Sequence, residues 1–221
     1  MKIDRGWIPG ERDLEWIEGA SDEPVAALLA MERLAEQERV PIVDRASGRV
    51  LAALAAGRRR IVEVGTAIGY STLWMALGQP ADGTIVTIDP DTGRTSRARE
   101  WWREAGVADG RITVVTARAL EAFADREPAL AGPFDLAFVD ALKPEYGAYV
   151  EALVSRLAPG ALLVADNVLW SGRVSGARPA ATDDRDTAAL REFGESILRD
   201  ARFRATILPV GDGLLIAGYR G

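Results

Sequence analysis

Five short apolar runs that alternate with helical stretches limit the fold of this chain more than any other feature. The runs cover residues 61–64, 84–88, 112–115, 134–139 and 162–165. The helical stretches between them lie at about residues 70–78, 92–105, 119–126 and 145–157. Continuous apolar strands separated by helices are typical of a parallel sheet whose two faces are both covered. The pattern therefore predicts an α/β fold.

The end of the chain breaks this alternation. Two further strand-like runs, at 205–210 and 214–218, are joined only by Gly211, Asp212 and Gly213. A parallel crossover needs about a dozen residues or more, so these two strands must form an antiparallel hairpin. A mostly parallel, seven-stranded sheet that ends in such a hairpin resembles the Rossmann-like class I methyltransferases.

The residues before the first strand have helical character. Ser21 and Asp22 are placed to cap one helix, with Pro24 near its first turn. A second helix is expected at 46–55. The segment around Pro41 should be extended, because a proline disfavours helical geometry in the residue before it. Extra N-terminal helices are therefore expected to precede the sheet.

We expect a single domain over 1–221, because the sequence contains no internal repeat and no long linker. Residues 1–58 would be its N-terminal helical part and 59–221 its Rossmann-like core. No apolar run approaches the roughly 20 residues that a membrane span requires. The N-terminus has no apolar signal region either, so we expect a cytoplasmic protein.

The residue types that are missing restrict the chemistry. The chain has no cysteine and no histidine, so a bound metal would need oxygen ligands. Oxygen ligands favour a hard cation such as Mg²⁺ over Zn²⁺. Lys2 and Lys143 are the only lysines, and all the other basic residues are arginines. Because arginine does not release its proton at working pH, Lys143 is the only internal amine that could act as a base.

A glycine turn follows the first predicted strand. Gly65 allows the backbone to turn sharply, and the next helix begins near Tyr70, so its free N–H groups would face the same crevice. Ala67 stands where a dinucleotide-binding pattern requires glycine. The segment Gly69-Tyr70-Ser71 also differs from a phosphate-binding loop, which excludes both familiar motifs.

Two carboxylates near this turn suggest a bound nucleoside. Asp89 ends the second strand, where it could accept hydrogen bonds from ribose hydroxyls or cap the next helix. Glu63 ends an apolar strand and needs a partner. The cationic amino-acid end of S-adenosylmethionine could interact with it, through water. Ala117 and Arg118 follow the third strand, where an adenine edge could be recognised.

Oxygen donors also follow the fourth and fifth strands. Asp140 ends one of them, and Asp166 and Asn167 end the other. Neighbouring strands lie about 5 Å apart, so the three side chains could form one face of an octahedral cation site. Alternatively, the two aspartates could cap helices and Asn167 could belong to a turn. Lys143 lies just beyond Asp140, either as a general base or as a solvated surface residue.

Four segments together resemble the cation-dependent O-methyltransferases, the family of catechol and caffeoyl-CoA O-methyltransferases. They are residues 63–71, 138–143, 166–174 and 208–213, and the resemblance extends from about residue 20 to the C-terminus. The bacterial, small-domain members are the most similar. The family implies S-adenosylmethionine as cofactor and Mg²⁺, or another hard cation such as Ca²⁺ or Mn²⁺, as metal.

The resemblance assigns a role to each candidate residue. It implies that Asp140, Asp166 and Asn167 bind the metal and that Lys143 and Asp140 are catalytic. The expected cofactor-binding residues are Ile42, Val43, Glu63, Gly65, Tyr70, Ser71, Asp89, Ala117, Arg118 and Asp140. The expected substrate-binding residues are Leu142, Lys143, Asn167 and Trp170. The implied reaction is a direct displacement, in which Lys143 takes a hydroxyl proton and the oxygen attacks the sulfonium methyl.

Two positions depart from the family pattern, so the resemblance does not specify the substrate or the contact to adenine. Leu142 stands where many members have a second acid and animal catechol enzymes an aromatic residue. Arg118 replaces the usual acid of the adenine loop. The segment 168–181, which contains Trp170, is typical of a mobile loop over the substrate. Trp170 would either stack on an aromatic ring or anchor that loop.

Three functional readings follow from these residues. The first is methylation of one hydroxyl of a small, catechol-like aromatic molecule. The second is methylation of a hydroxyuridine in tRNA, supported by Arg173, Arg178 and Arg185 but opposed by the net charge of −6. The third is a non-catalytic cofactor-binding protein.

We also expect a homodimer. The N-terminal segment presents apolar residues such as Trp7, Trp16 and Ile17, which a second subunit could cover.

Overall fold

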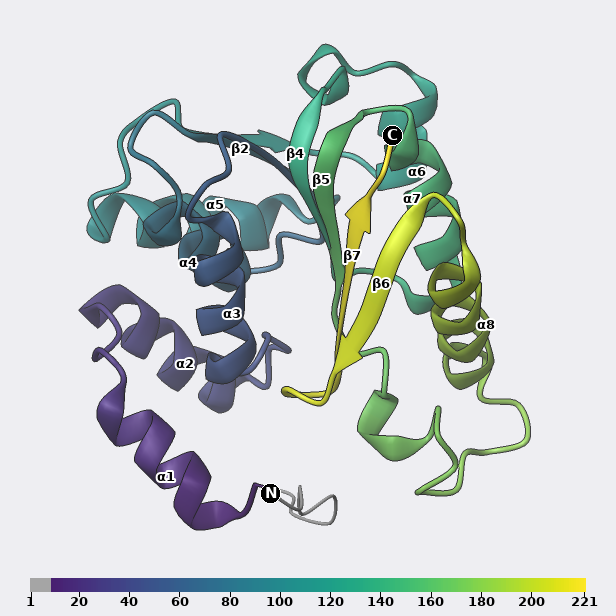
Figure 1. The fold of residues 1–221 in the computed structure, drawn as a ribbon. Coiled ribbons are helices and arrows are strands. Elements are labelled where there is room, and N and C mark those ends of the chain that lie inside the picture. Colours follow the sequence, from purple (N-terminus) through teal and green to yellow (C-terminus); the bar gives the residue numbers. More distant parts are fainter. Residues whose placement is uncertain (1–8) are drawn as a thin grey trace, which may run out of the picture.

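A seven-stranded sheet forms the centre of the computed structural model, which describes residues 9–221 (Figure 1). Trp7, one of the residues behind the expected homodimer, lies outside the described residues. The strands are β1 Arg60–Val64, β2 Thr84–Ile88, β3 Ile112–Val115, β4 Phe134–Val139, β5 Leu157–Ala165, β6 Phe203–Leu208 and β7 Leu214–Tyr219. Their order across the sheet is β3-β2-β1-β4-β5-β7-β6.

The direction of the strands confirms the predicted fold class. Strands β1 to β5 run parallel, with β1 between β2 and β4. Strand β7 pairs antiparallel with both β5 and β6. The sheet reverses its order between β1 and β4, and this is the place where α/β sheets bind ligands beyond the carboxyl ends of their strands.

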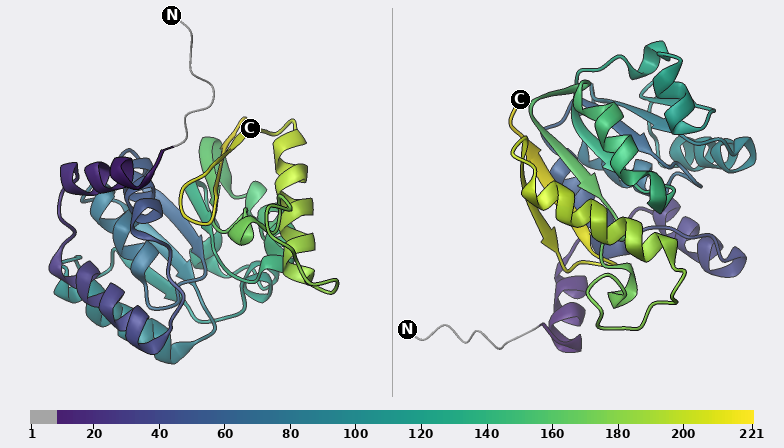
Figure 2. Two further views of the ribbon diagram at one scale, coloured as in Figure 1. Left: turned by 90° about the horizontal axis from the view of Figure 1, so that it is seen from below. Right: turned by 90° about the vertical axis from the view of Figure 1, so that its right-hand side faces the viewer.

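Helices cover both faces of the sheet, as Figures 1 and 2 show. The α-helices are α1 Glu11–Ala20, α2 Ala26–Glu38, α3 Arg45–Ala55, α4 Tyr70–Gly78, α5 Thr92–Glu104, α6 Ala119–Ala124, α7 Tyr146–Val154 and α8 Arg185–Arg199. Alternate residues of one strand pack on opposite faces: Leu136 joins the core beneath α2 to α5, and Ala137 joins the core beneath α6 to α8. Among residues 9–221, no helix is both long and apolar enough to cross a membrane.

The structure corrects several local expectations. The strand expected at 205–210 is β6, which covers Phe203–Leu208. Ser21 does not cap α2 but ends α1, where its hydroxyl donates to the Ile17 carbonyl at 2.6 Å. Helix α2 begins only at Ala26, after an extended stretch.

Residues 155–157 do not continue the preceding helix, because β5 already begins at Leu157 and pairs there with Phe134. Helix α8 was not expected, although Asp184 caps it through the Thr187 N–H group at 3.0 Å.

Helix α1 differs from the other helices because none of its residues is buried. It contacts the protein through Glu18, whose carboxylate forms ion pairs with Arg45 and Arg49 of α3. Its apolar residues Leu14 and Trp16 face solvent, with 60% and 73% of their surface exposed. Charged contacts rather than apolar burial therefore hold α1 in place.

Candidate active site

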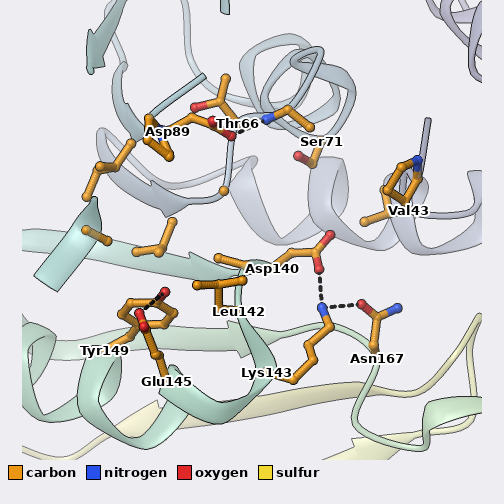
Figure 3. Close-up of a pocket in the computed structure, with 18 of the residues that line it drawn as sticks. Val43, Thr66, Ser71, Asp89, Asp140, Leu142, Lys143, Glu145, Tyr149 and Asn167 are labelled. Atoms are coloured by element: carbon orange, nitrogen blue, oxygen red, sulfur yellow. Dashed lines mark hydrogen bonds and ion pairs between the residues drawn. The ribbon is translucent and has the colours of Figure 1, made fainter. Parts of the chain in front are cut away.

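A cavity of about 580 Å³ opens at the carboxyl ends of the parallel strands. Its walls come from the segments that follow β1, β2, β3, β4 and β5, together with the extended segment before α3. Figure 3 shows the two ends of this cavity. Asp140, Lys143 and Asn167 point toward one another at one end, and Glu145 and Tyr149 lie at the other.

Gly65 determines how closely β1 and β4 approach each other at the cavity floor. Its φ angle of +103° lies in a region that side chains rarely allow. A Cβ atom at this position would lie 2.0 Å from the carbonyl oxygen of Asp140. The Asp140 N–H group donates to the Val64 carbonyl at 2.9 Å. This bond joins the ends of β1 and β4 directly beside the turn. Gly65 therefore positions Asp140 as well as shaping the turn after β1.

Gly65→Ala should destabilise the protein by more than about 2 kcal/mol, because the methyl group meets a backbone oxygen and the φ angle is unfavourable. Urea denaturation would measure the loss. Gly147→Ala is the matched control, because Gly147 lies in α7 with open space around its Cα atom. The control should be neutral or slightly stabilising. Equal effects of both variants would contradict this role of Gly65.

Asp89 lies beside the Gly65 turn and lines the cavity. Its two carboxylate oxygens accept hydrogen bonds from the N–H groups of Ala67 and Asp91, each at 2.8 Å. The cap of the next helix is Asp91, whose side chain accepts from the Arg94 N–H group. Asp89 is thus held rigidly by the backbone and keeps lone pairs for a ligand, which favours the hydroxyl-binding alternative over the helix cap.

Glu63 is fully buried and does not line the cavity. Its carboxylate accepts hydrogen bonds from the hydroxyls of Ser71 at 2.5 Å, Thr72 and Thr87 at 2.6 Å. Burial outweighs these bonds and raises the pKa of Glu63 to about 7. Ser71 does line the cavity, so it lies between Glu63 and the space that a ligand could occupy.

Glu63→Gln should change how stability depends on pH. The folded protein holds the Glu63 proton more tightly than the unfolded chain does, so the free energy of unfolding falls as pH rises from about 4.5 to about 7. Glutamine has no such proton. Relative to wild type, the variant should gain up to about 3 kcal/mol between these limits. Urea denaturation at both pH values would measure the difference, with the exposed Glu121→Gln as control. A parallel pH dependence of wild type and variant would contradict the prediction.

Lys143 is the centre of the polar cluster at the end of the cavity that contains Asp140 and Asn167. Its ammonium donates to Asn167 Oδ1 at 2.6 Å, Asp140 Oδ1 at 2.7 Å and Tyr146 Oη at 2.8 Å. The Tyr146 hydroxyl donates in turn to the Asp166 carbonyl at 3.2 Å. Trp170 also borders the cluster, with its ring centre 5.8 Å from the Lys143 nitrogen. Lys143 is thus held in the cavity and is not a solvated surface residue.

The backbone after β5 adopts uncommon conformations to present these groups. Asn167, Trp170 and Ser171 have φ angles of +61°, +48° and +53°. Such angles in residues other than glycine are concentrated at functional sites. The β6–β7 turn holds this segment: Asp212 accepts from the Leu169 N–H group at 2.9 Å through its carbonyl and from Ser171 N–H through its side chain. The hairpin of the C-terminus therefore supports the site.

Asp166 offers an acceptor that the described part of the chain does not use. Its Oδ1 atom is buried without a hydrogen-bond partner there, and the residue is only 2% exposed. Burial, together with the charge of Asp140, raises the pKa of Asp166 well above its ordinary value. A buried, unpaired carboxylate oxygen beside Asp140 and Asn167 fits a hard divalent cation, because a cation would compensate both the burial and the repulsion.

Most of the expected site residues meet in this one cavity. Glu63, Ala117 and Asp166 are the exceptions that do not line it. The residues that do are Ile42, Val43, Gly65, Tyr70, Ser71, Asp89, Arg118, Asp140, Leu142, Lys143, Asn167 and Trp170. The sequence reasoning missed Glu145 and Tyr149, which also line it. Their spacing of four residues at the start of a helix was the available signal.

Comparison with known proteins identifies the family. Residues 24–219 match the O-methyltransferase family model. A catechol O-methyltransferase from Mycobacterium tuberculosis is 38% identical over 207 residues, which is 90% of each chain. Tricin synthase 1 from Oryza sativa subsp. japonica is 38% identical over 174 residues, covering 73% of this chain and 67% of that protein.

Solved structures agree with this match. The O-methyltransferase TomG from Streptomyces achromogenes, determined in complex with S-adenosylmethionine, is 30% identical, with a TM-score of 0.81. The alignment covers 94% of this chain and 95% of TomG. The fold, the family match and this cofactor-bound neighbour lead to one conclusion. The chain belongs to the O-methyltransferase family and is an S-adenosylmethionine-dependent enzyme.

Proposed function

We propose that this enzyme methylates one hydroxyl of a small, catechol-like aromatic molecule with the help of a divalent cation, Mg²⁺ or another hard ion such as Ca²⁺ or Mn²⁺. The cluster of Lys143, Asp140 and Asn167 carries the proposal, because it joins the only internal lysine to two candidate cation ligands in one cavity. The similarity to a catechol O-methyltransferase supports the substrate class.

Asp140, Asp166 and Asn167 would hold the cation. All three offer oxygen atoms, and the Asp166 Oδ1 atom lacks another partner within residues 9–221. A bound cation supplies positive charge that favours the ionised form of an acceptor hydroxyl. A catechol offers two neighbouring oxygens, so it suits such a site better than a molecule with one hydroxyl.

Lys143 would act as the general base. It would take the proton of the acceptor hydroxyl on its amine, from a position fixed by Asp140, Asn167 and Tyr146. S-adenosylmethionine, when bound, supplies the methyl group on its sulfonium sulfur. Displacement at that methyl carbon would join it to the acceptor oxygen, break its bond to sulfur and release S-adenosylhomocysteine. Orientation of the two reactants in the cavity accounts for much of the rate.

The cofactor would lie along the opposite wall. Asp89 would accept the ribose hydroxyls, and Ser71 with the N-terminus of α4 would face the amino-acid end. Gly65 and Tyr70 would border it, and Ile42 and Val43 would adjoin the methyl group. Glu63 would act through Ser71 rather than by direct contact, since it is buried behind that hydroxyl. Leu142 and Trp170 would form the apolar surface beside the acceptor ring.

The proposed substrate class can be tested with two related acids. Labelled S-adenosylmethionine should transfer its methyl group to caffeic acid, which has two adjacent hydroxyls, and not to p-coumaric acid, which has one. Equal transfer to both would contradict the proposed role of neighbouring oxygens. Transfer to neither, with the cofactor still bound, would favour tRNA or a larger natural product as the acceptor.

The contacts of Arg173 within the protein favour a small acceptor over tRNA. Arg173 stacks 4.8 Å from the Trp170 ring centre and lies 3.5 Å from an Asp184 oxygen, so its charge is already partly compensated. Filter binding with bulk tRNA at low and moderate salt would test the alternative. Salt-dependent retention of tRNA would favour the RNA substrate.

We further propose a cytoplasmic homodimer in which a second subunit covers the exposed apolar residues of α1. Leu14, Trp16 and Ile17 would be the contacts. Light scattering at micromolar concentration should give the mass of a dimer, and Trp16→Glu should shift it toward that of a monomer. A monomeric mass for wild type would contradict this assembly.

A further inference from the structure

The end of the cavity away from Lys143 contains a carboxylate that is held in place by its own helix. The Tyr149 hydroxyl donates to Glu145 Oε2 at 2.6 Å. Both residues line the cavity, and Tyr149 is almost fully buried, so its hydroxyl has little freedom to choose another partner. The bond uses one carboxylate oxygen and leaves Oε1 available to a ligand. Neither the cluster around Lys143 nor the ribose site at Asp89 uses this pair.

The position of the pair restricts which part of a ligand it can meet. Asp89, which would bind the ribose, and Lys143, which would meet the methyl acceptor, lie at separate places in the cavity (Figure 3). Glu145 and Tyr149 lie on the side away from Lys143 and Asn167. Arg118, from the segment after β3, lines the same cavity. The charge of Arg118 acts on the Tyr149 hydroxyl, so a nucleoside base bound beside this pair would meet one cation and one carboxylate.

An adenine ring needs this combination. Its Watson–Crick edge presents an acceptor, the ring nitrogen N1, next to a donor, the exocyclic N6 amine. Arg118 offers only donors, and a guanidinium cannot accept a hydrogen bond from the amine. A carboxylate can, and hydrogen bonds to ionised groups are roughly twice as strong as neutral ones. Glu145 supplies the acceptor that Arg118 cannot provide.

We propose that Glu145 is the residue that selects adenine in this enzyme, by accepting a hydrogen bond from the exocyclic amine of the cofactor. Tyr149 is its positioning residue, because it fixes one carboxylate oxygen and aims the other. The inference rests on the proposed arrangement of S-adenosylmethionine in the cavity, with its ribose at Asp89.

The test compares two product analogues by isothermal titration calorimetry. S-adenosylhomocysteine carries the amine, and its 6-deamino analogue, whose base is unsubstituted purine, carries hydrogen there and keeps N1 as an acceptor. Wild type should bind the adenosyl compound at least about tenfold more tightly, since the deamino analogue leaves the carboxylate without its hydrogen bond. In Glu145→Gln a neutral carboxamide replaces the carboxylate and its bond to the amine is weaker, so the preference should fall to about threefold or less. Tyr149→Phe should lower the preference partially, because the carboxylate loses its fixed orientation.

Glu121→Gln is the matched control, because Glu121 is an exposed acid on α6 outside the cavity, and its preference should equal that of wild type. An unchanged preference in Glu145→Gln, with thermal melts showing a folded protein, would overturn the inference. A raised KM for the acceptor without a change in cofactor preference would also overturn it. Failure of wild type to bind either analogue would instead refute the proposed cofactor arrangement.

Discussion

Asp140→Ala should lower kcat/KM for methyl transfer at least about 10²-fold, and addition of EDTA to wild type should have an equally large effect. The substitution removes one of the three proposed cation ligands and the carboxylate that accepts from Lys143 at 2.7 Å. Loss of a single group that stabilises developing charge costs about 10²–10³ in rate. Transfer of the labelled methyl group to caffeic acid would measure both effects.

The two treatments together distinguish loss of the cation from damage to the fold. Mg²⁺ added back after EDTA should restore wild type and leave Asp140→Ala inactive. Asp125→Ala, which changes an exposed carboxylate at the end of α6, should keep full activity and full sensitivity to EDTA. Transfer that continues unchanged in EDTA would refute the role of a cation, whatever the variant does.

Lys143→Arg should lower kcat by about 10²–10⁴-fold while cofactor affinity stays within about threefold of wild type. The guanidinium keeps a positive charge beside Asp140 and Asn167, but it does not release a proton at working pH and cannot serve as the base. Single-turnover transfer would measure the chemical step, and calorimetry with S-adenosylhomocysteine would measure cofactor binding.

Lys143→Met provides the comparison for charge. If Lys143 acts as the base, arginine and methionine should both abolish most of the rate, because neither can accept a proton. If the residue only contributes positive charge, arginine should retain activity and methionine should not. A Lys143→Arg variant with more than half of the wild-type kcat would therefore exclude Lys143 as the base.

The positions of the central strands β2 and β4 could be predicted accurately because of how these strands are buried. Strands covered on both faces appear in the sequence as continuous apolar runs, so both match their predicted bounds, whereas β5 begins earlier than predicted. Helix α8 shows that a signal can also be overlooked: Leu190, Phe193 and Ile197 recur on one face behind the Asp184 cap. The Ser21 cap failed because local preference does not tell whether a serine ends one helix or begins the next.

The hydrogen-bond partners of Glu63 depend in part on the neighbouring strand. Nothing local to β1 indicates that Thr87 of β2 would donate to its carboxylate, since this contact follows from the strand register that pairs the two residues. Ser71 and Thr72 donate to the same carboxylate from α4, the helix that follows β1. The sequence predicts an acidic residue near the cofactor, and the packing of β1, β2 and α4 buries its side chain.

The sequence by itself determined the chemical types at the edge of the sheet. A strand that ends in a carboxylate must present it where its neighbours also end, so Asp89, Asp140 and Asp166 could be assigned to one crevice. The tertiary structure decided which of these atoms meet. The three bonds of Lys143, the unpaired Asp166 oxygen and the support of Leu169 by the β6–β7 turn depend on contacts between segments far apart in the chain. Such contacts are fixed by strand order and close packing, which no local pattern of residues encodes.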